Sequence, residues 1–276
     1  MRRSIFAIAL AAALSALLAA PAAADKLDDV KARGKLVVGV SDTTPPFSFR
    51  KPGEDAITGY DIDLVRSVAK RFVTERMGVA LELVPVSSAE RIPFLQQDKL
   101  DFVATSMTRT RERLRDIDFS YIYFVTPHAV IVKKKSGITS VRQLAGRKAS
   151  SASTSTAGGN LKDAVPDVNI VYVRDYAIAF EALKDGTVDA FTTDETVLTA
   201  IVRQDGHPDD YLFLPDFAKS RDVGFALKKD EPRLKATIDR ALLDIESSGE
   251  AATIWNAWFG PGTDMLMTRR FKIQAD

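Results

Sequence analysis

Two arginines stand beside hydroxyl-bearing residues in polar segments that interrupt apolar runs. Arg91 follows Ser88 by three positions, and Arg113 follows Ser106 and Thr108 within one segment. A planar guanidinium presents paired N–H donors that match a carboxylate, and neighbouring hydroxyls satisfy the acceptor's remaining hydrogen bonds. These residue types at this spacing predict a site that grips a small molecule by its carboxylates.

Each of these side chains also has a plainer explanation. Arg109, Arg111 and Arg113 share one charged segment, and such a segment usually forms a solvated face of a protein. Arg91 could pair with a nearby carboxylate such as Glu90 on a surface helix. Whether these residues form a binding site or a polar surface depends on the helices and strands that position the two segments.

The first residues have the features of an export signal. A basic start, Met1-Arg2-Arg3, precedes an almost wholly apolar run over 5–20, and small residues at 22–24 offer a cleavage site. We expect a signal peptide over 1–24, cleaved after Ala24, and export to the periplasm. A retained membrane anchor is the alternative, but the apolar run is short beside the roughly 20 residues of a spanning helix.

Composition limits the chemistry of the remaining chain. The 276 residues contain no cysteine, which excludes a disulfide framework and a thiolate metal site. The two histidines, His128 and His207, lie far apart without ligand-like spacing. The formal net charge of +1 argues against nucleic acid as a partner. We therefore expect neither a metal nor a cofactor.

Strand-like and helix-like patterns alternate after the signal. Residues 36–40 are a continuous apolar run of strand length, and the spacing of apolar residues over 61–72 predicts a helix with Asp61 placed to cap its start. Two further strands and a short helix are expected at 81–84, 102–104 and 91–97. This alternation predicts an α/β fold.

A weak internal echo suggests two similar lobes. Residues 98–106 follow a short helix, contain a strand and end in hydroxyls, and residues 185–194 repeat this pattern. Ligands of open α/β sheets bind at the carboxyl ends of strands, so the polar ends Ser106 and Asp194 are candidate contacts. Coincidence is the alternative, and Asp194 could instead cap a helix over 196–203.

The order of several short motifs resembles one family. The motifs include Val-Gly-Val, Pro-Pro-Phe-Ser-Phe and Gly-Tyr-Asp-Ile-Asp-Leu, and the matching segments lie at 38–40, 45–49, 59–64, 116–120, 144–147 and 248–260. Each motif is weak alone, but their order over nearly the whole mature chain is specific. The chain resembles the periplasmic solute-binding proteins of bacterial polar amino acid ABC importers, of the family 3 type.

The resemblance implies a fold and a function. The fold is the two-lobed periplasmic binding protein fold of type II, with a ligand cleft between lobes joined by two hinge strands. The first lobe would comprise 25–122 and 222–276, and the second lobe 123–221. The function implied is a monomeric, non-catalytic receptor that captures an amino acid and delivers it to a membrane permease and its ATPase.

Within the family, the segment Ser88–Pro93 is similar to that of the glutamate- and aspartate-binding members. The resemblance implies that Arg113 grips the ligand's α-carboxylate, helped by Ser106 and Thr108. It also implies that Asp194 accepts hydrogen bonds from the α-ammonium. Cations would thus meet a carboxylate, and an acidic group would meet the ammonium.

Further residues carry over from the same resemblance. Arg91 and Ser88 would face the side-chain carboxylate of the ligand. From the second lobe, Ser155 and Thr156 would close over the α-carboxylate. Phe47 could wall the cleft or pack in the core, and we place it near the ligand. An acidic amino acid is therefore the expected ligand.

The chain departs from the glutamate/aspartate pattern at three positions. Ser41 stands where a second basic residue is often found, Thr154 replaces the usual loop glycine, and Tyr176 stands where some acidic-amino-acid binders carry histidine. The run 150–159 is rich in hydroxyls and could be a flexible linker, but its place between a strand and a helix start favours a ligand-facing loop. Glutamine, asparagine or another polar amino acid stays open as the ligand.

Two other classes of protein are alternatives. One is an exported dehydratase on the same scaffold, for which Glu195 beside Asp194 is the one hint of a general acid or base. The other is a receptor that signals through a partner.

Overall fold

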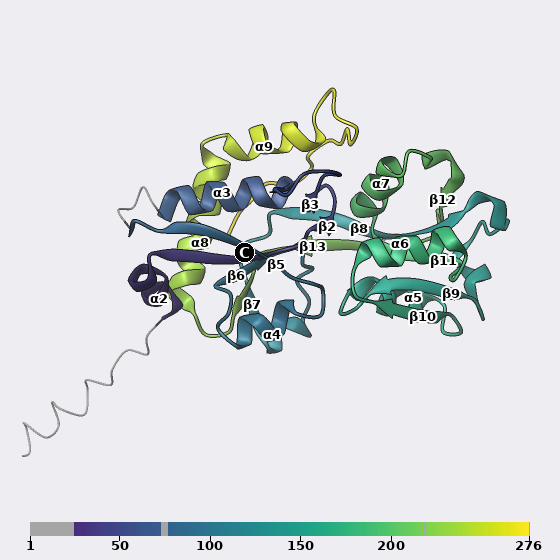
Figure 1. Cartoon of the computed structure of the whole chain (residues 1–276), viewed down its shortest axis with the longest axis horizontal. Coiled ribbons are helices and arrows are strands. Elements are labelled where there is room, and N and C mark those ends of the chain that lie inside the picture. The colour runs from purple at the N-terminus through teal and green to yellow at the C-terminus, as the bar shows by residue number, and fades with distance from the viewer. Residues whose placement is uncertain (1–24, 73–76, 218, 276) are drawn as a thin grey trace, which may run out of the picture.

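The computed structural model describes residues 25–72, 77–217 and 219–275, so the expected signal peptide lies outside the described residues. The strands form two larger sheets and one small sheet, and each larger sheet carries helices on its faces (Figure 1). Across the described ranges, no helix is long and apolar enough to cross a membrane. The arrangement confirms the predicted two-lobed α/β fold.

The first sheet has the strand order β5-β1-β6-β14-β7. Strand β1 pairs in parallel with β5 and β6, and β14 runs antiparallel to β6 and β7. The strands span Lys35–Val40 (β1), Ala80–Pro85 (β5), Phe102–Ala104 (β6), Ile117–Phe119 (β7) and Ala226–Lys228 (β14). The strands expected at 36–40, 81–84 and 102–104 are thereby confirmed.

Helices cover both faces of this sheet. Helices α3, α8 and α9 pack against one another on one side, while α4 lies on the other side (Figure 1). The helices span Lys26–Arg33 (α2), Tyr60–Phe72 (α3), Arg91–Gln96 (α4), Pro232–Ser247 (α8) and Glu250–Phe259 (α9). Val38 and Phe102 face the main core, whereas Val103 faces a smaller cluster with Leu95 of α4, as the alternation of side chains along strands requires.

The second sheet repeats this design. Its order is β10-β9-β11-β8-β12, with β13 also paired to β8. Strand β9 is parallel to β10 and β11, and β8 is antiparallel to β11, β12 and β13. The strands span Phe124–Lys133 (β8), Lys148–Ala152 (β9), Asn169–Val173 (β10), Ala190–Asp194 (β11), Tyr211–Phe213 (β12) and Lys219–Val223 (β13). Its helices span Thr156–Ala164 (α5), Tyr176–Asp185 (α6) and Glu195–Gln204 (α7).

The repeated sequence pattern at 98–106 and 185–194 corresponds to equivalent strands of the two sheets. Strands β6 and β11 each occupy the third position of their sheet. Strand β6 lies between its parallel neighbour β1 and its antiparallel neighbour β14, and β11 lies between its parallel neighbour β9 and its antiparallel neighbour β8. The polar ends of the two repeats, Ser106 and Asp194, therefore lie at equivalent edges of the two sheets. Coincidence does not explain this match of position.

Two paired strands run between the sheets. Strands β8 and β13 pair over 124–128 and 219–223, and both extend from one lobe to the other (Figure 1). Near the crossing, Tyr123 N donates to Val223 O at 3.0 Å, and Thr108 forms an isolated bridge with Val223. The lobe boundaries at 122/123 and 221/222 are a proposal, and the second of them falls inside β13.

A small sheet of β2 (Thr43–Thr44), β3 (Ser48–Arg50) and β4 (Ile57–Thr58) leads into α3. Gly59 has φ 140°, and a Cβ there would lie 2.0 Å from Phe47 O. Only glycine allows the chain to turn into α3 at this close approach.

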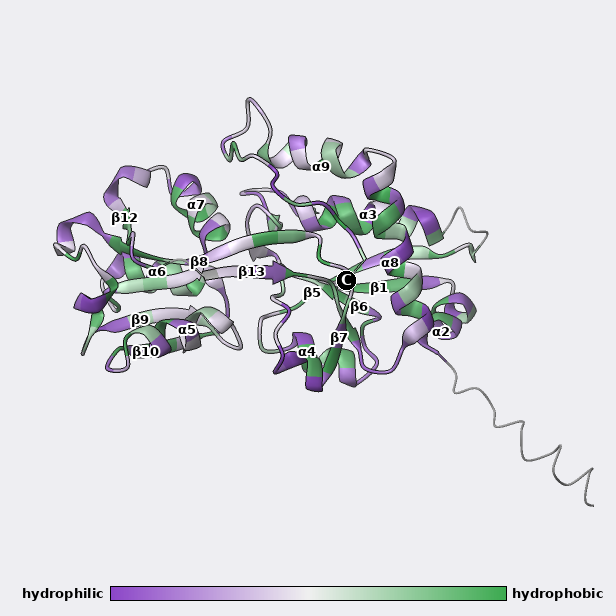
Figure 2. Ribbon diagram, turned by 180° about the vertical axis from the view of Figure 1, so that it is seen from behind, coloured by the Kyte–Doolittle hydropathy of each residue, from purple (hydrophilic) through white to green (hydrophobic). Residues whose placement is uncertain are grey.

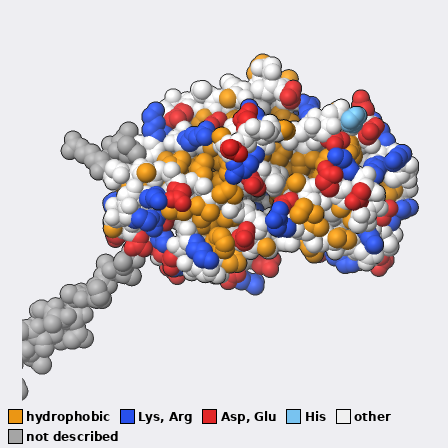
Figure 3. Space-filling view, viewed as in Figure 1, with side chains coloured by type: hydrophobic (Ala, Val, Ile, Leu, Met, Phe, Trp, Pro, Cys, Tyr) orange, Lys and Arg blue, Asp and Glu red, His pale blue; other side chains and the backbone are white. Residues whose placement is uncertain are grey.

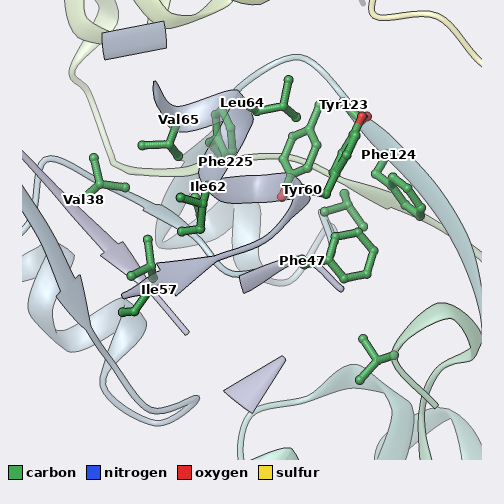
Figure 4. Close-up of a cluster of buried hydrophobic side chains, with 14 of the residues drawn as sticks. Val38, Phe47, Ile57, Tyr60, Ile62, Leu64, Val65, Tyr123, Phe124 and Phe225 are labelled. Carbon is green, nitrogen blue, oxygen red and sulfur yellow. The ribbon is translucent and has the colours of Figure 1, made fainter. Parts of the chain in front are cut away.

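The main core is aromatic where the first lobe meets the crossing strand. Tyr60, Tyr123 and Phe225 are fully buried and lie together in Figure 4, beside Phe47 and Phe124. The apolar residues of α3 belong to this core, and hydrophobic and hydrophilic residues alternate along its ribbon (Figure 2). The packed core holds the ends of β6 and β8 in fixed positions.

Candidate functional site

Polar residues of both lobes meet at the carboxyl ends of their parallel strands. The segment after β5 carries Ser88 and leads to Arg91, the first residue of α4. The turn after β9 carries Thr154. Arg91 and Arg113 both donate hydrogen bonds to Thr154, so the two lobes are in direct contact here. This edge of an open α/β sheet is where ligands are expected to bind.

Arg91 is a buried cation with neutral partners. Its side chain is 3% exposed. Its Nε donates to Ser88 O at 3.1 Å, Nη1 donates to Thr105 Oγ1 at 3.2 Å, and Nη2 donates to Thr154 Oγ1 at 3.3 Å. Burial lowers the pKa of Arg91, while the nearby Tyr176 and Asp194 act in the opposite direction. A guanidinium has five N–H donors, so two of them stay available to a ligand.

Arg113 lies beside it on the short 3₁₀ turn Arg113–Arg115 and is 9% exposed. Its Nη1 donates to Thr108 O and its Nη2 to Thr154 O, each at 2.6 Å. Burial, and then the repulsion of Arg91, lower the pKa of Arg113 to about 10. Arg113 therefore keeps its charge at neutral pH, and two buried cations stand side by side.

Asp194 supplies the negative charge of this group. It ends β11 and is 3% exposed. Burial raises the pKa of Asp194 to about 7, although Arg113 and Arg91 favour the ionised form. The residue occupies the N-cap position of α7, but its side chain makes no capping hydrogen bond. The carboxylate is thus free of the alternative structural role.

His128 is a neighbour of Asp194 that the sequence did not single out. His128 of β8 lies opposite Asp194 in the strand register, and its Nε2 lies 3.4 Å from Asp194 Oδ1. It also contacts Asn160, whose Nδ2 lies 2.9 Å from His128 Nδ1, and Thr156, whose Oγ1 lies 3.4 Å from Nε2. An isolated histidine in an apolar strand gives no signal by spacing, so only the fold brings it to this group.

Ser106 and Thr108 lie in the segment between β6 and Arg113. Ser106 is 3% exposed with φ 49°, and its side chain favours the ionised form of Asp194, which opposes the rise that burial causes in the pKa of that carboxyl. Its backbone N–H donates to Asp61 Oδ2 at 2.8 Å. The expectation that Asp61 caps α3 is wrong: the residue lies inside the helix and fixes the Ser106 backbone instead.

The hydroxyl-rich run is a tight turn and not a linker, since β9 ends at 152 and α5 begins at 156. The Ser155 side chain caps α5 by accepting from Ala157 N at 3.2 Å. Thr156 contacts His128. Thr154 makes the contacts to the first lobe, although the sequence marked it only as a replacement for glycine.

Phe47 does not join these residues. Its ring is fully buried, with its centroid 4.7 Å from that of Phe124 and 6.3 Å from that of Tyr60 (Figure 4). The packing places Phe47 in the aromatic core. Phe47 is therefore a core residue, which was the alternative to the expected position near a ligand.

Two cavities flank the contact at Thr154. One, of about 210 Å³, is lined by Arg91, Ser88, Thr105, Ser41 and Tyr176, among others. It therefore contains two of the three positions at which the chain departs from the glutamate/aspartate pattern.

The other cavity, of about 650 Å³, is more open and is lined by Arg113, Thr154, Ser155, Thr156 and Arg221, among others. Arg221 of β13 is a third cation that the sequence did not single out, and its Nε is buried without a hydrogen-bond partner within the described ranges. The described part of the chain contains no group of three or more His, Cys, Asp or Glu residues that could hold a metal ion.

Comparisons with known proteins agree with this geometry. Residues 36–261 match the model of the bacterial extracellular solute-binding proteins, family 3. A glutamine-binding protein of Geobacillus stearothermophilus is 37% identical over 67% of this chain and 70% of its own length. The glutamate/aspartate import solute-binding protein of Escherichia coli (strain K12) is 29% identical over 93% of this chain and 87% of its own length.

A solved structure of an ancestral arginine-binding protein bound to glutamine has a TM-score of 0.75 and 34% identity, and covers 83% of this chain and 99% of its own. The sheets, the cross-lobe site and these matches lead to one conclusion. The chain belongs to the bacterial extracellular solute-binding proteins of family 3.

Proposed function

We propose that the protein is the periplasmic receptor of an amino acid ABC importer, and that it captures an acidic amino acid, glutamate or aspartate, between its lobes. A membrane permease and its ATPase would receive the ligand. The observation that carries the choice of ligand is the burial of Arg91 among neutral acceptors. A buried cation that has no carboxylate hydrogen-bonded to it is costly, and a ligand carboxylate would reduce that cost.

The charges of the site complement those of the ligand. Arg113 would bind the α-carboxylate, with Ser106 and Thr108 beside it, and Asp194 would accept from the α-ammonium. Arg91 and Ser88 would meet the side-chain carboxylate. Two guanidiniums and one carboxylate on the protein thus match two carboxylates and one ammonium on the ligand, so every charge of the ligand would have a partner in the closed cleft.

Other carboxylates near Arg91 already have partners. Asp175, which lines the smaller cavity, accepts from Ile178 N at 3.0 Å and from Arg174 Nε at 2.9 Å. Glu90 accepts from Ser87 N at 2.8 Å. These groups are held by their own turns, so they do not take the place of the ligand's carboxylate.

Glutamine is the second candidate, for a specific reason. Ser41 and Tyr176 line the smaller cavity in place of basic residues, and hydroxyls suit an amide as well as a carboxylate. The glutamine-binding relative also has the higher identity of the two relatives compared above. A glutamine ligand would leave Arg91 with a neutral partner.

A binding screen separates these ligands. A thermal-shift screen of the purified mature protein against the common amino acids, followed by calorimetry, should give the largest stabilisation with glutamate or aspartate, since a ligand that binds the folded state raises the melting temperature. Stabilisation by glutamine without any response to glutamate or aspartate would overturn the acidic assignment. Turnover of a bound ligand would show an enzyme instead of a receptor.

Three further properties belong to this proposal. We propose that residues 1–24 direct export to the periplasm, that the receptor acts as a monomer, and that it needs no cofactor. Lys, Arg, Asp and Glu side chains are interspersed on the face shown in Figure 3. A mixed surface of this kind gives no extended basic patch on that face for a nucleic acid.

A further inference from the structure

Thr154 is the residue through which the second lobe touches both arginines of the first lobe. Its carbonyl oxygen accepts from Arg113 Nη2 at 2.6 Å. Its hydroxyl accepts from Arg91 Nη2 at 3.3 Å and donates to Ser88 O at 2.7 Å. The side chain of Thr154 thus closes a ring of hydrogen bonds, because Arg91 Nε also donates to Ser88 O.

The backbone at Thr154 is held in an unfavourable conformation. Its φ is 63°, in the left-handed region that β-branched residues rarely adopt. Glycine would reach this conformation without strain. A β-branched residue stays there only when its surroundings hold it in place, and such strained residues gather at binding and switching sites. The contacts to the first lobe hold Thr154 together with the hydrogen bond of its own turn, from Ser155 N to Ala152 O at 3.0 Å.

We propose that the Thr154 hydroxyl is a latch that favours the closed arrangement of the empty protein and that orients Arg91 toward the ligand. The second part rests on the proposed function, whereas the first part concerns the protein without any ligand. Thr154 is exposed at the edge of the contact, so water competes for its hydrogen bonds. The latch therefore shifts the balance between open and closed forms without locking it.

The latch has a consequence for affinity. Its hydrogen bonds join the lobes whether or not a ligand is bound, so they stabilise the closed forms relative to the open form. Raising the population of the binding-competent form raises the apparent affinity. Losing the hydroxyl should open the empty protein and weaken ligand binding by roughly tenfold, as expected for the loss of hydrogen bonds that include a charged donor.

A matched pair of variants isolates the hydroxyl. Thr154→Val keeps the shape, the β-branch and the carbonyl contact to Arg113, but lacks the hydroxyl. Thr154→Ser keeps the hydroxyl. Thr154→Gly is a second variant without a hydroxyl, for the case in which Val does not fold, and it also relieves the backbone strain.

Fluorescence energy transfer between the lobes measures closure directly. The chain has no cysteine, so Lys99→Cys on the first lobe and Asp167→Cys on the second place two dyes at exposed residues without competing thiols. In the empty protein we expect high transfer for the parent chain and for Thr154→Ser, and low transfer for Thr154→Val and Thr154→Gly. Saturating glutamate should restore high transfer in the Val variant.

Two results would overturn the latch. One is an empty Val variant with the same transfer distribution as the parent chain. The other is a Ser variant as open as the Val variant, since the hydroxyl would then have no effect. Because the comparison needs no ligand, the latch can fail while acidic amino acids still bind, and it can hold if the ligand proves to be another amino acid.

Discussion

Replacing Arg91 with methionine removes the buried guanidinium while keeping a long apolar stem in its place. Arg91 donates three hydrogen bonds, to Ser88, Thr105 and Thr154. Two of its five N–H groups are then available to the ligand's side-chain carboxylate. Two charge-assisted hydrogen bonds of about 1.5 kcal/mol each amount to about 3 kcal/mol. The dissociation constant for glutamate should therefore rise by about 100- to 200-fold.

Glutamine provides the internal comparison. Its amide offers one uncharged acceptor, so the same substitution should weaken glutamine binding by only about tenfold. Isothermal titration calorimetry of both ligands against both proteins gives the four constants that are needed. Arg111→Met is the control, because it makes the same substitution at an exposed arginine of the neighbouring segment that carries Arg113.

An equal loss of affinity for glutamate and glutamine would refute the reasoning, since Arg91 would then act on a part of the ligand that both share. An unchanged glutamate affinity would refute it as well. Circular dichroism and thermal melting of the Met variant show whether the fold is retained, because the Ser88 carbonyl and the Thr105 hydroxyl lose a donor.

Three other outcomes follow from the site. Arg113→Met should lower the affinity for all amino acid ligands alike, by about 100-fold or more, because it removes the partner of the α-carboxylate that they share. Calorimetry with glutamate and glutamine checks this. A loss of affinity for only one of the two ligands would contradict it. Ligand binding should strengthen as pH rises through 7, because burial raises the pKa of Asp194 to about 7 and the ligand's ammonium needs the ionised carboxylate. The affinity at pH 6 should be about tenfold lower than at pH 8. The Asp194→Asn variant should bind weakly, and its affinity should not change with pH in this range. Ser155→Ala should lower stability by about 1 kcal/mol in urea unfolding, because its hydroxyl caps α5. It should reduce affinity far less than Arg113→Met, since a neutral hydroxyl contributes less than a guanidinium to binding a carboxylate. A loss of affinity as large as that of Arg113→Met, without a loss of stability, would contradict the capping role.

The sign of the pH effect has a counterpart in the stability of the empty protein. The pKa of Asp194 in the folded chain, about 7, lies above its ordinary value of 3.8, so the folded state binds the proton more tightly than the unfolded state does. Stability from this group is present below pH 4 and is lost as pH rises toward 7. Ligand binding reverses the penalty by pairing the carboxylate, and it should release a proton near neutral pH.

Local patterns were sufficient for several elements of the first lobe. The continuous apolar run at 36–40 became β1, and the helical spacing over 61–72 became α3, because both patterns report burial in a sheet or against one. The echo between Ser106 and Asp194 also had structural meaning. It marked the third strand of each sheet, which is fixed by topology and not by any single residue.

Local sequence patterns could not predict the contacts between the lobes. Thr154 meets Arg91 and Arg113 only because the lobes come together across β8 and β13. His128 and Arg221 lie on those two crossing strands, and neither has a neighbour in sequence that marks it as part of a site. Phe47 shows the same limit, because an aromatic residue in a loop gives no local sign of whether it faces a cleft or a core.

The most direct measurement is a crystal structure of the mature protein grown with glutamate. We expect one amino acid between the lobes, with its α-carboxylate on Arg113, its ammonium on Asp194 and its side-chain carboxylate on Arg91. A ligand whose side chain points away from Arg91, or a ligand ammonium that does not reach Asp194, would contradict the claim that every charged group of the ligand is paired by the site.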